Sequence, residues 1–255
     1  MRLTGFEGQT AFVTGAAGGI GLAVVRALTQ AGAQVVATDV PDAIAQAPQM
    51  DGVTWTALDV QDADAVTACV DRTIRDHGPI GLCVYAAGIL AEGALLETSA
   101  EAWRRVLAVN LDGAFHVTTA LGRHMAQGGQ GAIVVIGSNA AGIPRVNMGS
   151  YPASKAALHM MVRCLGLELA PQGVRCNIVA PGSTLTTMQT RMWADDSGAA
   201  RVIEGNLALH KTGIPLGKIA TPEDIAASVM FMLSDQAGHV TMADLYVDGG
   251  ATLRA

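Results

Sequence analysis

Two residues of this sequence, Tyr151 and Lys155, have the types and the spacing that acid–base chemistry needs. They stand at the start of an apolar-periodic run, residues 151–169, which predicts a helix, and residues four apart share one face of a helix. The Lys155 ammonium would lie near the Tyr151 phenol, and a nearby positive charge lowers the pKa of a phenol. Such a phenol can take a proton from an alcohol or return one to a ketone. The Y-x-x-x-K pattern is common, however, and an exposed tyrosine beside a solvated lysine is the alternative.

A glycine-rich turn near the N-terminus could hold the phosphates of a dinucleotide. Residues 10–14 predict a strand, a helical pattern runs to about residue 31, and Gly15-Ala-Ala-Gly-Gly-Ile-Gly21 joins the two. Gly15 permits the tight turn, and Gly19 lets the backbone approach a pyrophosphate at the helix N-terminus. Gly21 allows the helix to pack closely on the strand. This order of strand, glycine turn and helix is the context that a dinucleotide-binding fingerprint requires.

Asp39 ends the second predicted strand, roughly 20 residues after the glycines, where an acid meets the adenosine ribose in dinucleotide-binding folds. A carboxylate there repels the 2′-phosphate of NADP, and no arginine stands at position 16, 17 or 40 to accept that phosphate. The sequence therefore predicts NAD as the cofactor. The alternative is that Asp39 serves only as a turn or helix-cap residue.

Apolar segments that predict strands alternate with helical patterns along the chain. This alternation predicts an α/β fold, a single-domain Rossmann-type doubly wound parallel sheet with helices on both faces. No linker, repeat or charge run divides residues 1–255, so we expect one NAD-binding domain. Ligands bind beyond the carboxyl ends of the strands in such sheets. The residues at predicted strand ends are Gly15, Asp39, Asp59, Gly88, Ser138 and Pro181. Asp59 could receive the adenine amino group, or it could cap a turn.

Asn110 interrupts a long helical pattern over residues 99–125. An asparagine inside an apolar helix is costly unless its amide is hydrogen-bonded. A kink at this point, or a bound water held by a freed backbone carbonyl, would explain its presence.

Composition and charge argue against several other classes of protein. Hydrophobic residues make up 50% of the chain and charged residues 15%, which is ample for a large core. The net charge of −6 predicts no nucleic-acid partner, and no apolar stretch is long enough to predict a membrane span. The four cysteines lie far apart in apolar segments, and the six histidines form no ligand-like cluster. We therefore expect buried, reduced thiols, no metal site and a cytoplasmic protein.

Together these motifs resemble those of the short-chain dehydrogenase/reductase family, over nearly the whole chain. The matching residues are Thr14-Gly15-Ala-Ala-Gly-Gly19-Ile-Gly21, Asn110, Ser138, Tyr151-x-x-x-Lys155 and Pro181-Gly182. The resemblance implies that Tyr151 is the general base, that Lys155 lowers its pKa and bonds the nicotinamide ribose, and that Ser138 holds the substrate oxygen. It also implies that Asn110 anchors a water that relays the proton through Lys155. Family members usually assemble through two long helices, so we expect a homotetramer.

The cofactor-binding residues implied by the motifs and the resemblance lie mostly at strand ends. Among them, Thr186 would bond the nicotinamide carboxamide and Thr184 would help through its backbone. The predicted set is Gly15, Gly19, Ile20, Gly21, Asp39, Asp59, Val60, Ala87, Gly88, Tyr151, Lys155, Pro181, Gly182, Thr184 and Thr186. The sequence departs from the family at Tyr85-Ala-Ala-Gly88, where Asn-Asn-Ala-Gly is usual. This departure puts in doubt a structural hydrogen-bond anchor, but not the chemistry.

A narrower resemblance links this sequence to the 2,3-dihydro-2,3-dihydroxybenzoate dehydrogenases of catecholate siderophore biosynthesis. Residues 181–193, 213–220 and 247–250 carry it. The resemblance implies that NAD oxidises a ring alcohol of a carboxylated cyclic substrate, after which the ketone can tautomerise to a catechol.

The substrate carboxylate calls for a cation, and Arg145 is the candidate because a guanidinium fork matches a carboxylate in two-point geometry. Residues 183–212 would form a lid in which Met188 and Gln189 close over the ring. Arg145 could instead be a surface residue, and the lid methionines could belong to the core or to an interface.

Three alternatives share these motifs. The substrate could be the amino analogue 2,3-dihydro-3-hydroxyanthranilate, or another cyclic secondary alcohol, since ring substitution is read by the shape of the pocket. From another class, the chain could be a non-catalytic NAD-binding sensor. The presence of Asn110, Ser138, Tyr151 and Lys155 together argues against a sensor.

Overall fold

Short strands rich in valine, isoleucine and alanine pair in parallel to form one sheet in the computed structural model, which describes residues 2–253. The central strands are buried on both faces, as strands of a parallel sheet are when helices cover it. The strands are β1 (Thr10–Thr14), β2 (Gln34–Asp39), β3 (Val53–Ala57), β4 (Ile80–Tyr85), β5 (Gly131–Ile136), β6 (Val174–Pro181) and β7 (Asp244–Val247).

The spatial order of the strands is β3-β2-β1-β4-β5-β6-β7. The chain therefore builds the sheet outward from β1 in one direction and then returns to β1 to build in the other. The loops that leave β1 and β4 diverge at this reversal, and ligands of doubly wound sheets bind there, beyond the carboxyl ends of the strands. The expected α/β, doubly wound parallel sheet is confirmed.

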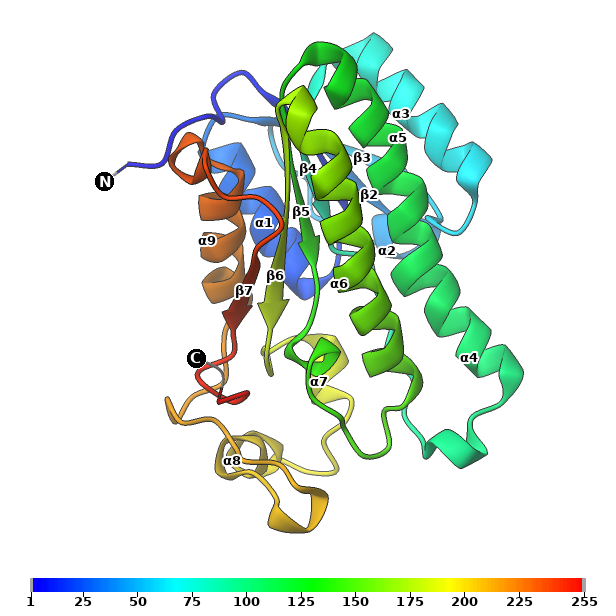
Figure 1. Cartoon of the computed structure of the whole chain (residues 1–255), viewed down its shortest axis with the longest axis vertical. Coiled ribbons are helices and arrows are strands. Elements are labelled where there is room, and N and C mark those ends of the chain that lie inside the picture. The colour runs from blue at the N-terminus through cyan, green and yellow to red at the C-terminus, as the bar shows by residue number, and fades with distance from the viewer. Residues whose placement is uncertain (1, 254–255) are drawn as a thin grey trace.

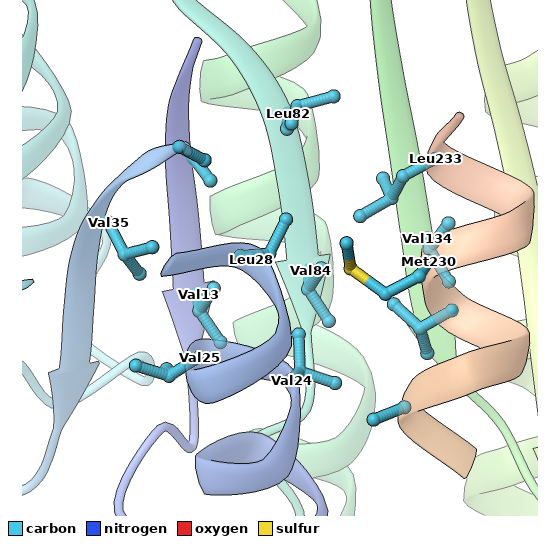
Figure 2. Packing of buried hydrophobic residues seen from close by; sticks show 14 of the residues in the cluster. Val13, Val24, Val25, Leu28, Val35, Leu82, Val84, Val134, Met230 and Leu233 are labelled. Atoms are coloured by element: carbon cyan, nitrogen blue, oxygen red, sulfur yellow. The ribbon is translucent and has the colours of Figure 1, made fainter. Parts of the chain in front are cut away.

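Helices cover both faces of the sheet (Figure 1). On one face, α1 (Gly19–Gln30) and α9 (Pro222–Leu233) share a core with the strands. In this core, Val24 and Leu28 of α1 lie on the same side of the sheet as Met230 and Leu233 of α9 (Figure 2). On the other face lie α3 (Ala63–His77), α5 (Gly113–Gly128) and α6 (Ser150–Leu169). Smaller elements are α2 (Pro41–Ile44), α4 (Ala100–Leu107), a π-helical turn (Ala108–Asp112), α7 (Thr187–Thr190) and α8 (Gly198–Glu204).

Local signals in the sequence set the starts of several helices. Asp62 accepts a hydrogen bond from the Ala65 N–H at the start of α3. At α9, Thr221 and Asp224 form a reciprocal capping box, with Pro222 in the first turn. Each such cap stabilises its helix by about 1 kcal/mol because it satisfies backbone donors that the helix leaves open.

The structure corrects one expectation about the cysteines. Cys69, Cys83 and Cys176 are buried, but Cys164 is exposed on the outer surface of α6. Among residues 2–253, no helix is long and apolar enough to cross a membrane.

Candidate active site

A cavity of about 450 Å³ opens at the carboxyl edge of the sheet. In Figure 1 the arrowheads of β5, β6 and β7 point toward the segment that carries α7 and α8. The cavity brings together many of the predicted site residues from distant parts of the chain. Those that line it are Ile20, Gly88, Ser138, Arg145, Tyr151, Lys155, Pro181, Gly182, Thr184, Thr186, Met188 and Gln189.

Ser138, Tyr151 and Lys155 converge at the inner wall of this cavity. Ser138 follows β5, while Tyr151 and Lys155 lie one turn apart on α6, as their spacing predicts. The Tyr151 hydroxyl and the Ser138 side chain share a hydrogen bond. The Lys155 Nζ lies 5.8 Å from the centroid of the Tyr151 ring and donates a hydrogen bond to the Ile136 carbonyl oxygen at 2.8 Å.

Burial dominates the electrostatics of this group. Burial raises the pKa of Tyr151, and the hydrogen bond with Ser138 opposes that rise. Burial also lowers the pKa of Lys155 to about 8. The sequence predicts that Lys155 lowers the Tyr151 pKa; in this structure the pKa is raised, because the desolvation of the phenol outweighs the hydrogen bond with Ser138.

Asn110 lies in the π-helical turn between α4 and α5, so the helical pattern is interrupted at this residue. Its side chain is fully buried, and its amide is satisfied, as the cost of burial requires. The Oδ1 accepts from the Ile89 N–H at 2.8 Å, and Nδ2 donates to the Ile89 carbonyl and to the Ser154 Oγ, both at 3.0 Å. Asn110 does not line the cavity, but Gly88 does, and Gly88 lies next to both Asn110 and Lys155. A Cβ added at Gly88 would lie 3.4 Å from the Asn110 Oδ1 and 3.7 Å from the Lys155 Nζ.

Tyr85 takes part in anchoring this turn. It is fully buried at the end of β4, and its hydroxyl donates a hydrogen bond to the Val109 carbonyl oxygen at 2.5 Å. Burial raises the pKa of this phenol, and the charges of Asp59 and Asp112 raise it further. The departure at Tyr85-Ala-Ala-Gly88 therefore brings in a hydrogen bond of its own between β4 and the π-helical turn.

The turn between β1 and α1 has the shape that a dinucleotide phosphate needs. Gly15 has φ of +62°, and a Cβ there would lie 2.6 Å from the backbone of Ala86 and Ala87. A Cβ at Gly21 would lie 2.0 Å from the Gly15 carbonyl oxygen. Helix α1 begins at Gly19 without a side-chain cap, which leaves backbone N–H groups at its N-terminus for an anion. The residues of this turn therefore fit the pyrophosphate of a nicotinamide dinucleotide.

The acidic residues at the adenosine end have protein partners. The Asp39 Oδ2 accepts from the Ala17 N–H at 3.0 Å, so this carboxylate also ties the glycine turn to β2. Its oxygens keep further lone pairs for a ribose. Asp59 is exposed, and its Oδ1 accepts hydrogen bonds from the backbone and the side chain of Gln61. This is the arrangement expected if Asp59 caps a turn. The Val60 side chain is buried in the core, 2.6 Å from where a Cβ at Gly113 would lie.

Besides Lys155, three cations line the cavity: Arg145, Lys211 and Arg201, of which Arg201 is ion-paired with Asp195. Arg145 is half-buried; burial lowers the pKa of its guanidinium, and Asp248 opposes this. Lys211 also lines the cavity, and its pKa is lowered by burial and by the charge of Arg145, with Glu92 opposing. No ion pair joins Arg145 or Lys211 to a carboxylate among the residues that the structure describes. Two like charges at one cavity suit an anionic ligand.

The segment from 183 to 212 supplies most of the outer wall, through Met188, Gln189 and Trp193 among others. Helix α8 packs closely on Trp193, since a Cβ at Gly198 would lie 2.2 Å from its ring. Lys211 is held by backbone hydrogen bonds between Asn206 and Lys211, in both directions at 2.9 Å. Sequence reasoning missed Lys211, because no motif marks it and the loop that carries it reaches the cavity only in the folded chain.

Comparisons with known proteins agree with this geometry. A family model described as enoyl-(acyl carrier protein) reductase matches residues 15–252. A 2,3-dihydro-2,3-dihydroxybenzoate dehydrogenase of Bacillus subtilis (strain 168) is 46% identical and covers 99% of both chains. A vibriobactin-specific 2,3-dihydro-2,3-dihydroxybenzoate dehydrogenase of Vibrio cholerae is 44% identical and covers 94% of this chain and 95% of its own length.

A solved structure gives the same result at the level of the fold. A short-chain type dehydrogenase/reductase from Mycobacterium ulcerans superposes with a TM-score of 0.88 at 31% identity, covering 98% of this chain and 92% of its own. The sheet order, the glycine turn and the Ser138–Tyr151–Lys155 group are thus accompanied by full-length likeness in sequence and in structure. This chain belongs to the short-chain dehydrogenase/reductase family of oxidoreductases, which use a nicotinamide cofactor.

Proposed function

We propose that this protein is an NAD-dependent dehydrogenase that oxidises a ring alcohol of 2,3-dihydro-2,3-dihydroxybenzoate, giving 2,3-dihydroxybenzoate for a catecholate siderophore. The observation that carries this proposal is the full-length likeness to the Bacillus and Vibrio relatives of that name. The cavity supports it, because it combines the Ser138, Tyr151 and Lys155 group on the inner wall with two cations, Arg145 and Lys211, that have no ion pair among the described residues.

The reaction removes a hydride from the alcohol carbon and a proton from the alcohol oxygen. NAD, when bound, supplies the hydride acceptor. Tyr151 takes the proton, and Ser138, which is hydrogen-bonded to Tyr151, holds the substrate oxygen against it. The ketone formed from a dihydrodiol tautomerises to a catechol, and this aromatisation draws the reaction forward.

Lys155 and Asn110 support that proton transfer. The Lys155 Nζ lies between the Tyr151 ring and the Ile136 carbonyl and would bond the nicotinamide ribose. Asn110 would anchor a water that relays the proton from Lys155 to solvent. The satisfied amide of Asn110 fixes the π-helical turn, so the backbone of this turn is the part available to that water.

The glycine turn would hold the cofactor pyrophosphate, and Gly88, Pro181, Gly182, Thr184 and Thr186 would surround the nicotinamide end. Asp39 favours NAD over NADP, because a carboxylate at this strand end repels a 2′-phosphate and accepts from ribose hydroxyls. Asp59, Val60 and Ala87 complete the proposed adenosine side. Val60 could contribute there only through its backbone, since its side chain is buried in the core.

Arg145 would pair with the substrate carboxylate, while Met188 and Gln189 would cover the ring. The guanidinium of Arg145 is half-buried at the cavity and lacks a carboxylate partner within ion-pair distance among the described residues. A charge-assisted pair with a carboxylate would compensate the desolvation of Arg145. Segment 183–212 would act as the lid.

We also propose a homotetramer located in the cytoplasm. Apolar side chains stand exposed on two of the helices that cover one face of the sheet: Phe115 on α5, and Met160 and Leu167 on α6. Exposed apolar residues gathered on neighbouring helices favour contact with another subunit.

Initial rates of NADH formation test the substrate class. The panel is 2,3-dihydro-2,3-dihydroxybenzoate, 2,3-dihydro-3-hydroxyanthranilate and cyclohexanols without a carboxylate, each with NAD and with NADP. We expect the dihydrodiol with NAD to give the highest kcat/KM. If the amino analogue or a plain cyclohexanol were the better substrate, the family and the Tyr151 chemistry would stand and the substrate assignment would fall.

A further inference from the structure

A buried histidine lies directly behind Ser138. His159 is on α6, one turn beyond Lys155, and only 4% of its surface is exposed. Its Nε2 lies 3.3 Å from the Ser138 backbone nitrogen, and its Nδ1 lies 3.0 Å from the Asp244 Oδ2 on β7. A backbone N–H can only donate, so Nε2 must be the acceptor. The proton of the neutral ring is then on Nδ1, where it is donated to Asp244.

The chain makes room for this ring immediately before Ser138. A Cβ added at Gly137 would lie 2.1 Å from the His159 Nε2 and 2.7 Å from the Ile178 Cγ2. Only glycine therefore lets the imidazole reach the Ser138 N–H. The ladder between β5 and β6 ends with the bond from the Gly137 N–H to the Val179 carbonyl, so the next donor, the buried Ser138 N–H, needs an acceptor from outside the sheet.

We propose that His159, oriented by Asp244, is a positioning residue for Ser138 and must be neutral at Nε2 to act. The backbone hydrogen bond fixes the end of β5, and the Ser138 side chain is aimed from that point. The Ser138 Oγ accepts from the Ala140 N–H at 3.1 Å and is hydrogen-bonded to Tyr151. A shift of the Ser138 backbone would therefore change the distance between the hydroxyl groups of Ser138 and Tyr151.

A proton on Nε2 would remove the acceptor and set two donors against each other. Protonation of this ring at acid pH should therefore lower the activity.

Asp244 favours the charged ring, and Arg163 counteracts Asp244. Burial would raise the pKa of Asp244, but hydrogen bonds and charges from His159 and Arg163 outweigh it and hold that pKa below its usual value. Arg163 is ion-paired with the same Oδ2, so it offsets part of the negative charge that the imidazole meets. The elements that carry or neighbour His159 also hold Lys155 on α6, Cys176 on β6 and Tyr246 on β7. Burial raises the pKa of Cys176 to about 12, so this thiol is neutral.

Two substitutions separate the two ends of the ring. The amide of His159→Gln reaches the place of Nε2 and can still accept from the Ser138 N–H. The shorter amide of His159→Asn reaches the place of Nδ1, keeps Asp244 and leaves the Ser138 N–H without an acceptor. We expect kcat to fall roughly tenfold to a hundredfold in His159→Asn. We expect His159→Gln to stay within about threefold of the natural enzyme and to lose the histidine part of the acid limb. NADH affinity, measured by fluorescence, should be the same in both.

A second variant tests the charge argument at a half-exposed position that should not disturb folding. Arg163→Gln should move the acid limb of the kcat profile to higher pH, because Asp244 then favours the charged ring more strongly. Arg123→Gln, which removes an exposed arginine from neighbouring α5, is the matched control and should not move the limb.

Nitrogen-15 NMR of the imidazoles, with His159 identified by its absence in His159→Gln, gives a readout that does not use turnover. At neutral pH the Nδ1 should carry the proton and Nε2 should not. Equal kcat in the Asn and Gln variants, an acid limb that does not respond to Arg163→Gln, or a proton on Nε2 would each overturn the proposal. The effect on kcat rests on the role proposed for Ser138. If Ser138→Ala kept full activity, the role proposed for Ser138 would be wrong. The NMR result would still show whether the Ser138 N–H donates to the His159 Nε2.

Discussion

The burial of Lys155 should make the stability of the protein depend on pH. The pKa of Lys155 in the folded protein is lowered by burial from 10.5 to about 8. Between these two values the unfolded lysine is protonated and the folded one is not, so the unfolded state binds more protons. The contribution of Lys155 to stability therefore rises as pH increases from about 8 to 10.5, by about 3 kcal/mol across the window.

The comparison of the natural protein with Lys155→Met tests this sign. The difference between their free energies of unfolding, from urea titrations at a series of pH values, should grow in favour of the natural protein as pH rises through that window. Taking the difference removes the effects of titratable groups that do not interact with Lys155. A difference that is flat, or that shrinks with pH, would mean that Lys155 is charged and compensated in the folded state.

Arg145 carries the proposed selectivity for a carboxylated ring. Arg145→Ala should raise KM for the dihydrodiol by roughly tenfold or more while lowering kcat less, because a charge-assisted hydrogen bond is lost from substrate and transition state alike. Arg145→Lys should lie between the two, since an ammonium keeps the charge but not the planar fork. Arg201→Ala, at another arginine of the cavity wall that is already paired with Asp195, is the control. If Arg145→Ala left KM as it was, Arg145 would not contact the substrate.

At the scale of elements, the side chain of Asn110 ties the π-helical turn between α4 and α5 to the loop after β4. Asn110→Ala would leave the backbone N–H and C=O of Ile89 without their partners in a part-buried place. We expect the free energy of unfolding to fall by about 2–3 kcal/mol. Ser154→Ala removes only one partner of Asn110 and should cost about 1 kcal/mol. Equal losses in the two variants, measured by urea denaturation, would show that the amide does not hold the turn.

The same elements show what the sequence could predict about the site. Ser138, Tyr151 and Lys155 were predictable, because strand ends of a parallel sheet meet at one edge and residues four apart share a helix face. The interruption of the helix at Asn110 was predictable from the cost of a buried amide. The bonds of Tyr85 and His159 were not, since each joins elements far apart in sequence, and no local pattern marks a tyrosine that reaches the carbonyl of Val109. Lys211 was missed for a similar reason, because the loop that carries it reaches the cavity only in the folded chain.

At the scale of the whole molecule, the fold was the most predictable part. Alternating strands and helices leave few topologies for a chain of this length, and the right-handed crossover rule removes most of those. The association of subunits is harder to predict, because exposed apolar side chains mark a surface but not its partner. Leu167 on α6 is 67% exposed, which is unusual for a leucine on a helix that is otherwise packed against the sheet.

The proposed homotetramer can be tested at that residue. Light scattering after size exclusion should give four times the chain mass of 26.1 kDa for the natural protein. Leu167→Glu should give a smaller species, because a charge in a subunit interface is costly unless it is paired. Leu95→Glu, at an exposed leucine of the loop before α4, is the control and should keep the tetramer. A natural protein that runs as a monomer would contradict the proposal.

The measurement that tests the central claim most directly is the identification of the product when the protein meets NAD and 2,3-dihydro-2,3-dihydroxybenzoate. The account predicts one 2,3-dihydroxybenzoate, detected by mass spectrometry, for each NADH formed. It also predicts that kcat falls roughly a hundredfold or more in Tyr151→Phe while NADH still binds. Formation of NADH without the catechol, or undiminished turnover in Tyr151→Phe, would contradict it.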